Sequence, residues 1–87
     1  MYYAVYRTTN GGAPKLVKRF LQKDHNHRAK RAALQYLHDL WRIALQSPSN
    51  LWLGHNGDTE IHYTRTTSAR TLDKISIYIK AHHDNSK

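Results

Sequence analysis

The chain has 87 residues, which is enough for one small hydrophobic core and too few for a second domain. Its 14 Lys and Arg against 6 Asp and Glu give a formal charge of +8, which indicates an acidic partner. Cysteine is absent, which excludes disulfides, thiolate zinc sites and a thiol nucleophile. We expect a single domain over residues 1–87, with a flexible tail at residues 83–87.

The sequence predicts a protein that does not enter membranes. No stretch approaches the roughly 20 apolar residues that a helix needs to cross a bilayer. The opening residues, MYYAVYRTTNGG, lack the basic and then apolar order of a secretory signal. We therefore expect the protein in the cytoplasm, which is the host cell's cytoplasm if the protein is viral.

A β-hairpin is predicted at the N-terminus. Residues 2–8 are rich in aromatic and β-branched side chains, which favour strands. Alternation then places Tyr2, Ala4 and Tyr6 on one face and Tyr3, Val5 and Arg7 on the other. The Asn, Gly and Pro of residues 10–14 favour a turn. A second strand over residues 15–21 completes the antiparallel hairpin.

The longest predicted element is an amphipathic helix over residues 24–46, with Asp24 or Asn26 as its N-cap and Pro48 beyond its end. At about 100° per residue, its apolar face is broad enough for a central helix. That face contains Ala29, Ala33, Tyr36, Leu37, Leu40, Trp41, Ile43 and Ala44. The opposite face contains Arg28, Arg31, Gln35, His38, Asp39, Arg42 and Gln46. We expect Leu37 and Leu40 to be deeply buried.

A second hairpin is predicted after the helix, with strands over residues 51–54 and 59–65. Asn56 and Gly57 form a strong signal for a two-residue hairpin loop. That loop would place Trp52 opposite Ile61 and on the same face as Tyr63. We expect these three side chains to share the core.

The last stretch before the tail fits two structures. Leu72, Ile75 and Ile79 have the spacing of one helix face, whereas Ile75, Ile77 and Ile79 alternate as in a strand. The capping chemistry of Ser68 favours the helix slightly, although Ile-Ser-Ile-Tyr-Ile is the best β sequence in the chain. The predicted fold is therefore α+β. Two β-hairpins form a small antiparallel sheet on one long central helix, with a short C-terminal helix or a fifth strand.

Basic side chains are concentrated on the second strand and on the exposed helix face. The first 23 residues contain no acid. This density of Lys and Arg is typical of surfaces that contact phosphates. The candidate nucleic-acid- or partner-binding residues are Lys15, Lys18, Arg19, Lys23, Arg28, Arg31, His38 and Arg42.

A second candidate surface is the side of the sheet that the helix does not cover. Tyr2, Tyr6, Lys18 or Arg19 are candidates for this side. Tyrosines on an open sheet beside Lys and Arg can stack on unpaired bases and neutralise phosphates. The equally weighted alternative is that these tyrosines are ordinary core or sheet-surface residues, with the charges only solvated.

Catalytic and metal sites are not predicted. The seven histidines include no pair with the i, i+4 helical spacing of a zinc protease, and no Glu lies between candidate ligands. Exposed histidines that gain charge below neutral pH are the commoner explanation. The serines have no Gly-x-Ser-x-Gly context, and the six acids form no pair at a useful spacing. We expect no enzyme activity, no cofactor and no metal.

The first half of the chain resembles sheet-based DNA-reading modules such as integrase-arm domains. The resemblance is carried by the Tyr-rich first strand, the Gly turn, the basic strand KLVKRF and the Ala-rich helix. The chain departs from that pattern because it has two strands before the helix where three are expected. No functional residue is carried over.

The first functional prediction is a small, basic, non-catalytic nucleic-acid-binding domain that contacts phosphates of DNA or RNA. The alternative is a small inhibitor or adaptor of the phage or mobile-element type, with an anti-defence or host-takeover role. Such a protein would dock its basic surface on an acidic host protein or nucleoprotein complex. Binding to bare nucleic acid would distinguish the first from the second.

Overall fold

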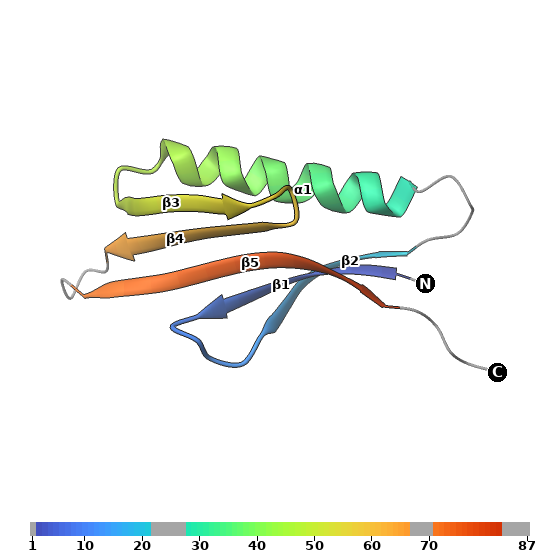
Figure 1. Cartoon of the computed structure of the whole chain (residues 1–87), viewed down its shortest axis with the longest axis horizontal. Helices are drawn as coiled ribbons and strands as arrows, with labels where there is room; N and C mark the ends of the chain where they lie inside the picture. The colour runs from blue at the N-terminus through green and yellow to red at the C-terminus, as the bar shows by residue number, and fades with distance from the viewer. Residues whose placement is uncertain (1, 22–27, 67–70, 83–87) are drawn as a thin grey trace.

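The computed structural model describes residues 2–21, 28–66 and 71–82, without the side chain of Trp52. Its elements are β1 Tyr2–Thr9, β2 Lys15–Leu21, α1 Arg28–Gln46, β3 Asn50–Asn56, β4 Glu60–Thr66 and β5 Leu72–His82. The predicted α+β class, with one antiparallel sheet and one helix, is confirmed (Figure 1). The predicted N-caps of the helix and the predicted tail lie outside the described residues.

The five strands form one sheet in the order β2-β1-β5-β4-β3, and every neighbouring pair is antiparallel. The last of the described strands, β5, is therefore the central strand of the sheet. It pairs with β1 from Tyr2↔His82 to Thr9↔Ile75, and with β4 from Glu60↔Tyr78 to Thr66↔Leu72. Within the sheet, the β1–β2 and β3–β4 hairpins are joined through this strand.

The slight preference for a C-terminal helix is wrong over residues 72–82, which form β5. Residues 68–70, where that helix would start, lie outside the described residues. The backbone of β5 forms hydrogen bonds with β1 on one side and with β4 on the other, so its N–H and C=O groups find partners on both sides. Its alternation also buries Ile75 and Ile77 on one face. Pairing with distant strands therefore determines the secondary structure of this segment, whose local sequence pattern fits both a helix and a strand.

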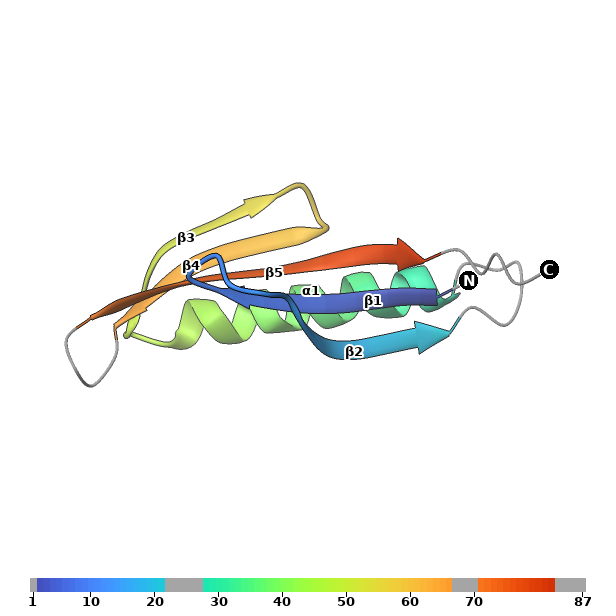
Figure 2. The same cartoon turned by 90° about the horizontal axis from the view of Figure 1, so that it is seen from below.

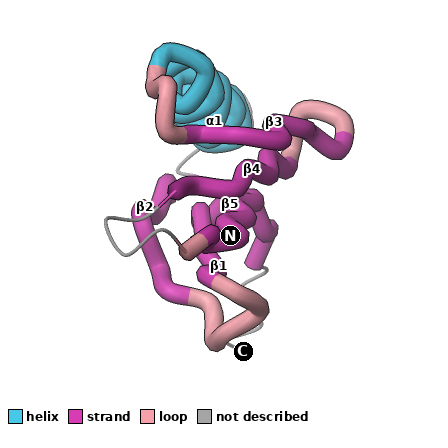
Figure 3. The backbone as a smooth tube through the Cα atoms, turned by 90° about the vertical axis from the view of Figure 1, so that its left-hand side faces the viewer, coloured by secondary structure: helices cyan, strands magenta, loops and turns pink. Residues whose placement is uncertain are grey.

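The helix α1 lies along one face of the sheet and contacts all five strands (Figures 1 and 3). Seen from below in Figure 2, β1 and β5 lie in front of it. Ala29 and Ala33 are buried against Tyr3 of β1, because their small side chains allow close approach. The helix ends at Gln46 as predicted. Beyond it, the side-chain amide of Asn50 donates a 2.9 Å hydrogen bond to the Ala44 carbonyl.

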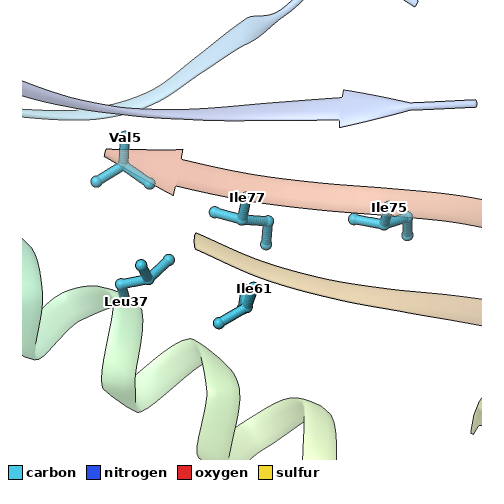
Figure 4. Close-up of a cluster of buried hydrophobic side chains, with 5 residues drawn as sticks. All are labelled: Val5, Leu37, Ile61, Ile75 and Ile77. Atoms are coloured by element: carbon cyan, nitrogen blue, oxygen red, sulfur yellow. The ribbon is translucent and has the colours of Figure 1, made fainter. Parts of the chain in front are cut away.

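The main core lies between α1 and the three middle strands. Its buried members are Val5, Leu37, Ile61, Ile75 and Ile77 (Figure 4). Leu37 is 1% exposed, which confirms its predicted burial. Leu40 is only partly buried at the margin of this cluster, so its predicted deep burial is wrong. Ile43, also assigned to the apolar face, is 63% exposed, because the apolar arc is wider than the area that the sheet covers.

The β1–β2 turn has the predicted chemistry. Asn10 and Gly11 have φ angles of 54° and 73°, in the left-handed region that Asn and Gly tolerate. The turn is also tied to β5. The Asn10 backbone N–H donates to the Lys74 carbonyl at 2.7 Å, and the Asn10 side-chain oxygen accepts from the Lys74 N–H at 2.8 Å. The end of the first hairpin is thereby fixed to the central strand.

The β3–β4 connection differs from the predicted two-residue loop. Asn56 pairs with Glu60, so three residues, from Gly57 to Thr59, connect the strands. Ile61 consequently lies opposite His55 and not opposite Trp52. Three-residue loops with one left-handed residue are a common alternative, and Gly57 supplies it with a φ of 60°. The prediction that Ile61 and Tyr63 share the core face is confirmed, whereas the Trp52 side chain lies outside the described atoms.

Gly57 gives a test of this connection. Replacing Gly57 by Val should lower the free energy of unfolding by about 1–2 kcal/mol, because a β-branched residue resists positive φ. Gly54→Val is the matched control, since neither glycine has an atom within 4 Å of an added Cβ and only Gly57 has positive φ. Urea denaturation of both variants measures the difference. Equal stabilities would contradict the left-handed conformation at Gly57.

Candidate nucleic-acid interface

The positive charge of the protein is displayed on its surface. Every Lys and Arg in the described ranges is exposed. Among them, only Arg65 lies within salt-bridge distance of a described carboxylate, with 3.9 Å between its Nη2 and Asp73 Oδ2. The other described Lys and Arg side chains have no described carboxylate within that distance. This surface is suited to an anionic partner.

The basic residues of β2 do not share one face. Lys18 pairs with Val5, so it lies on the helix side, and its Nζ is 5.6 Å from the Tyr36 ring centroid. Arg19 pairs with Ala4 and lies on the opposite side, with its Cζ 5.3 Å from the Tyr2 ring centroid. Of the two candidates for the open side of the sheet, Lys18 or Arg19, the structure places Arg19 there. Strand alternation separates the two cations.

The remaining predicted residues of this set lie at different places. Lys15 begins β2 and pairs with Arg7 near the turn. Lys23 lies outside the described residues. The helix residues Arg28, Arg31, His38 and Arg42 are all exposed along α1, as predicted. An acid lies beside that helix surface, since Asp39 accepts a 2.9 Å hydrogen bond from the Gln35 amide.

A groove of about 700 Å³ lies between α1 and the β3–β4 hairpin. Leu34, Leu37 and Ile61 contribute apolar lining. The Trp41 and His55 rings, which also line it, meet edge-to-face with their centroids 5.6 Å apart. Its polar lining consists of Arg31, Gln35, His38 and Asp58. Two of the predicted binding residues, Arg31 and His38, therefore belong to a partly apolar groove.

The face of the sheet away from α1 carries a different set of side chains. The register assigns to it Tyr2, Ala4 and Tyr6 of β1, Arg19 and Leu21 of β2, and Ser76, Tyr78, Lys80 and His82 of β5. We call this surface the open face. The placement of Tyr2, Ala4 and Tyr6 on one side agrees with the predicted alternation.

Aromatic rings on the open face contact one another across β1 and β5. The rings of Tyr2 and His82 are stacked, with centroids 4.7 Å apart and 12° between their planes. The Tyr6 hydroxyl forms a 2.8 Å hydrogen bond with His82 Nε2. The rings of Tyr6 and Tyr78 are tilted by 32°, with centroids 5.7 Å apart. These four residues form a continuous group, which we call the aromatic row.

The side of the open face toward β4 is more polar. His62 Nδ1 and Ser76 Oγ form a 3.2 Å hydrogen bond between β4 and β5. The Glu60 carboxylate lies 3.6 Å from His62 Nε2. Glu60 pairs with Tyr78 in the sheet register, so one acid lies at this margin of the face. The cations Arg19 and Lys80 lie on either side of Ala4, toward β2 and along β5.

Sequence reasoning missed Tyr78, Lys80 and His82 as members of this surface. These side chains share the open face because residues 72–82 form a strand. A helix over the same residues would not place them together. A signal was present, because Ser76, Tyr78, Lys80 and His82 alternate with Ile75, Ile77 and Ile79. The partner strands that fix the register could not be identified from that pattern alone.

Within residues 2–21, 28–66 and 71–82, no group of three or more His, Cys, Asp or Glu side chains could hold a metal ion. In the same ranges, α1 is not apolar enough to cross a membrane. Comparisons of the chain with protein-family models, with curated proteins and with solved structures found no match.

Proposed function

We propose that this protein is a non-catalytic domain that binds nucleic acid by contacting phosphates with exposed Lys and Arg. The observation that carries the proposal is the surface display of charge. All described Lys and Arg side chains are exposed, and of these only Arg65 is paired with a described acid. An anionic polymer would gain contacts and release counterions at such a surface. Apolar or cationic partners would gain neither.

Salt dependence tests the proposal directly. For a duplex, the logarithm of the binding constant should fall with the logarithm of salt concentration by about 0.9 for each phosphate contacted, over roughly four to six contacts. Fluorescence anisotropy with labelled DNA and RNA at several salt concentrations measures this slope. No binding to any DNA or RNA at low salt would refute the proposal.

Charge reversal at Arg31 and Arg42 should weaken binding to duplexes of all sequences and reduce the salt slope by about two, since each lost phosphate contact removes about one. Both residues are exposed on α1, so the thermal unfolding temperature should be unchanged. Replacement of the same two residues by Lys keeps the charge and serves as the control. Full binding by the double reversal would exclude the helix surface from the phosphate interface.

The groove beside α1 supports a second candidate function. Its lining combines Leu34, Leu37 and Trp41 with the cationic Arg31 and with His38, beside one acid, Asp58. A groove with these groups suits an acidic segment of a protein that also has apolar side chains. An inhibitor or adaptor of the phage or mobile-element type would use such docking on an acidic host protein. Co-purification with one host protein after nuclease treatment, without binding to bare nucleic acid, would favour this function.

A further inference from the structure

The open face is a packed layer of side chains that no described element covers. Ala4 belongs to this face, yet it is 0% exposed. Tyr2 and Tyr6 lie two residues away on the same strand, and Arg19 and Lys80 lie opposite on the two neighbouring strands. These larger side chains close over the small one. The centre of this surface is therefore closely packed.

Specific contacts hold the rings of the aromatic row in place. His82 both stacks on Tyr2 and forms a hydrogen bond with the Tyr6 hydroxyl, so it connects the two tyrosines. Tyr2 also has the Arg19 guanidinium over its ring. Rings fixed in this way lose little conformational freedom when a ligand binds, which favours affinity.

Tyr78 is the ring best placed to accept another flat group. Tyr2 has Arg19 on its β2 side and His82 on its β5 side. Among the described residues, Tyr78 has a ring neighbour only toward β1, where Tyr6 lies 5.7 Å away. Tyr78 is also only partly buried. One side of its ring is thus without an aromatic partner.

The charges around the aromatic row complement an anionic chain. Arg19 and Lys80 are exposed on the two sides of β1, and Lys74 is exposed further along β5. Glu60 is the acid on the β4 side, where it lies opposite Tyr78 in the sheet register and beside His62. The part of the face formed by β2, β1 and β5 therefore combines aromatic rings with cations. Unpaired nucleotides offer the matching groups, because each has a flat base and a negative phosphate.

We propose that the open face binds an unpaired stretch of nucleic acid, with a base stacked on Tyr78 and phosphates contacted by Arg19 and Lys80. This inference rests on the proposed nucleic-acid binding and specifies its substrate class. A duplex hides the faces of its bases within the stack, so it can offer the open face only its phosphates. Single-stranded RNA and single-stranded DNA share the required chemistry. The expected preference for unpaired strands comes from base stacking on the Tyr78 ring, because the phosphates that Arg19 and Lys80 contact are present on duplexes as well.

The test compares a short labelled strand, as RNA and as DNA, with the corresponding duplexes by fluorescence anisotropy. Tyr78→Leu should lower the affinity for the single strand roughly tenfold, because stacking on one aromatic ring is lost. Duplex binding should change little. Tyr78→Phe retains the ring and should restore single-strand affinity. Tyr63→Leu is the matched control, since Tyr63 is also partly buried but packs against the core on the helix side.

Three results separate the inference from the proposed function. If no nucleic acid binds at low salt, both are wrong. If Tyr78→Leu leaves single-strand affinity unchanged while reversal at Arg31 and Arg42 abolishes binding, only the open-face inference is wrong. If Tyr78→Leu instead changes self-association in sedimentation, without affecting nucleic-acid binding, a second copy of the chain covers this face and the inference is overturned. If the Tyr78→Leu variant does not fold, the same comparison can be made between Arg19→Ala on the open face and Arg42→Ala on α1.

Discussion

Replacing Ser76 by proline should prevent the protein from folding. Ser76 lies in the central strand, where it pairs with Thr8 on one side and His62 on the other. Proline has no backbone N–H and therefore removes a ladder hydrogen bond that no solvent-exposed edge can replace. The change also disturbs the strand that joins the two hairpins. Circular dichroism should show the loss of cooperative thermal unfolding.

The control places proline where the sheet can tolerate it. Val17 lies in the edge strand β2, at the register shift between Lys18 and Leu16. Proline is found mainly at such edges and bulges, so Val17→Pro should keep a cooperative transition. A folded Ser76→Pro variant, with a transition like that of Val17→Pro, would contradict the central position of β5.

Truncation of Leu37 to alanine should lower the free energy of unfolding by about 2–5 kcal/mol. Leu37 is 1% exposed and is the side chain through which α1 enters the main core. Its removal loses the transfer free energy of the side chain and leaves a cavity that a packed interior cannot fill. This loss is large for a small domain, whose total stability is roughly 5–15 kcal/mol. Urea denaturation followed by circular dichroism measures it.

The same substitution at two other positions of α1 calibrates the result. Leu40→Ala should cost less than Leu37→Ala, because Leu40 is only partly buried. Leu45 is 55% exposed, so Leu45→Ala should change stability by about 0.5 kcal/mol or less. A larger effect at Leu45 than at Leu37 would show that the helix packs through a different face.

Local chemistry was sufficient to predict several elements of this fold. The first hairpin, the end of α1 and the alternation of β1 depend on turn residues, on Pro48 and on strand periodicity, all of which act over a few residues. The helix face was predicted less well. A wide apolar arc shows which side of the helix faces the sheet but not where the sheet ends. Leu40 and Ile43, which belong to that arc, are therefore less buried than the arc alone predicts.

Features that depend on distant partners could not be predicted. The strand at residues 72–82 is stabilised by pairing with β1 and β4, and the sequence of the segment itself does not indicate these partners. The β3–β4 register depends on whether Asn56 belongs to the loop or to the strand, and a shift of this kind changes the residue opposite Ile61. The separation of Lys18 from Arg19 needed only strand alternation, whereas the proximity of Arg19 to the Tyr2 ring needed the paired sheet.

The central position of β5 also has a consequence for how the chain folds. Each hairpin can form from contacts that are local in the sequence, but the strand that unites them is synthesised after both hairpins. Until it emerges, β1 and β4 each have an edge without its partner, and such edges can pair with other chains. The joining contacts between β1 and β5 span most of the chain, which makes this step slow relative to hairpin formation. Conditions that stall synthesis before β5 should therefore favour aggregation over a partly folded monomer.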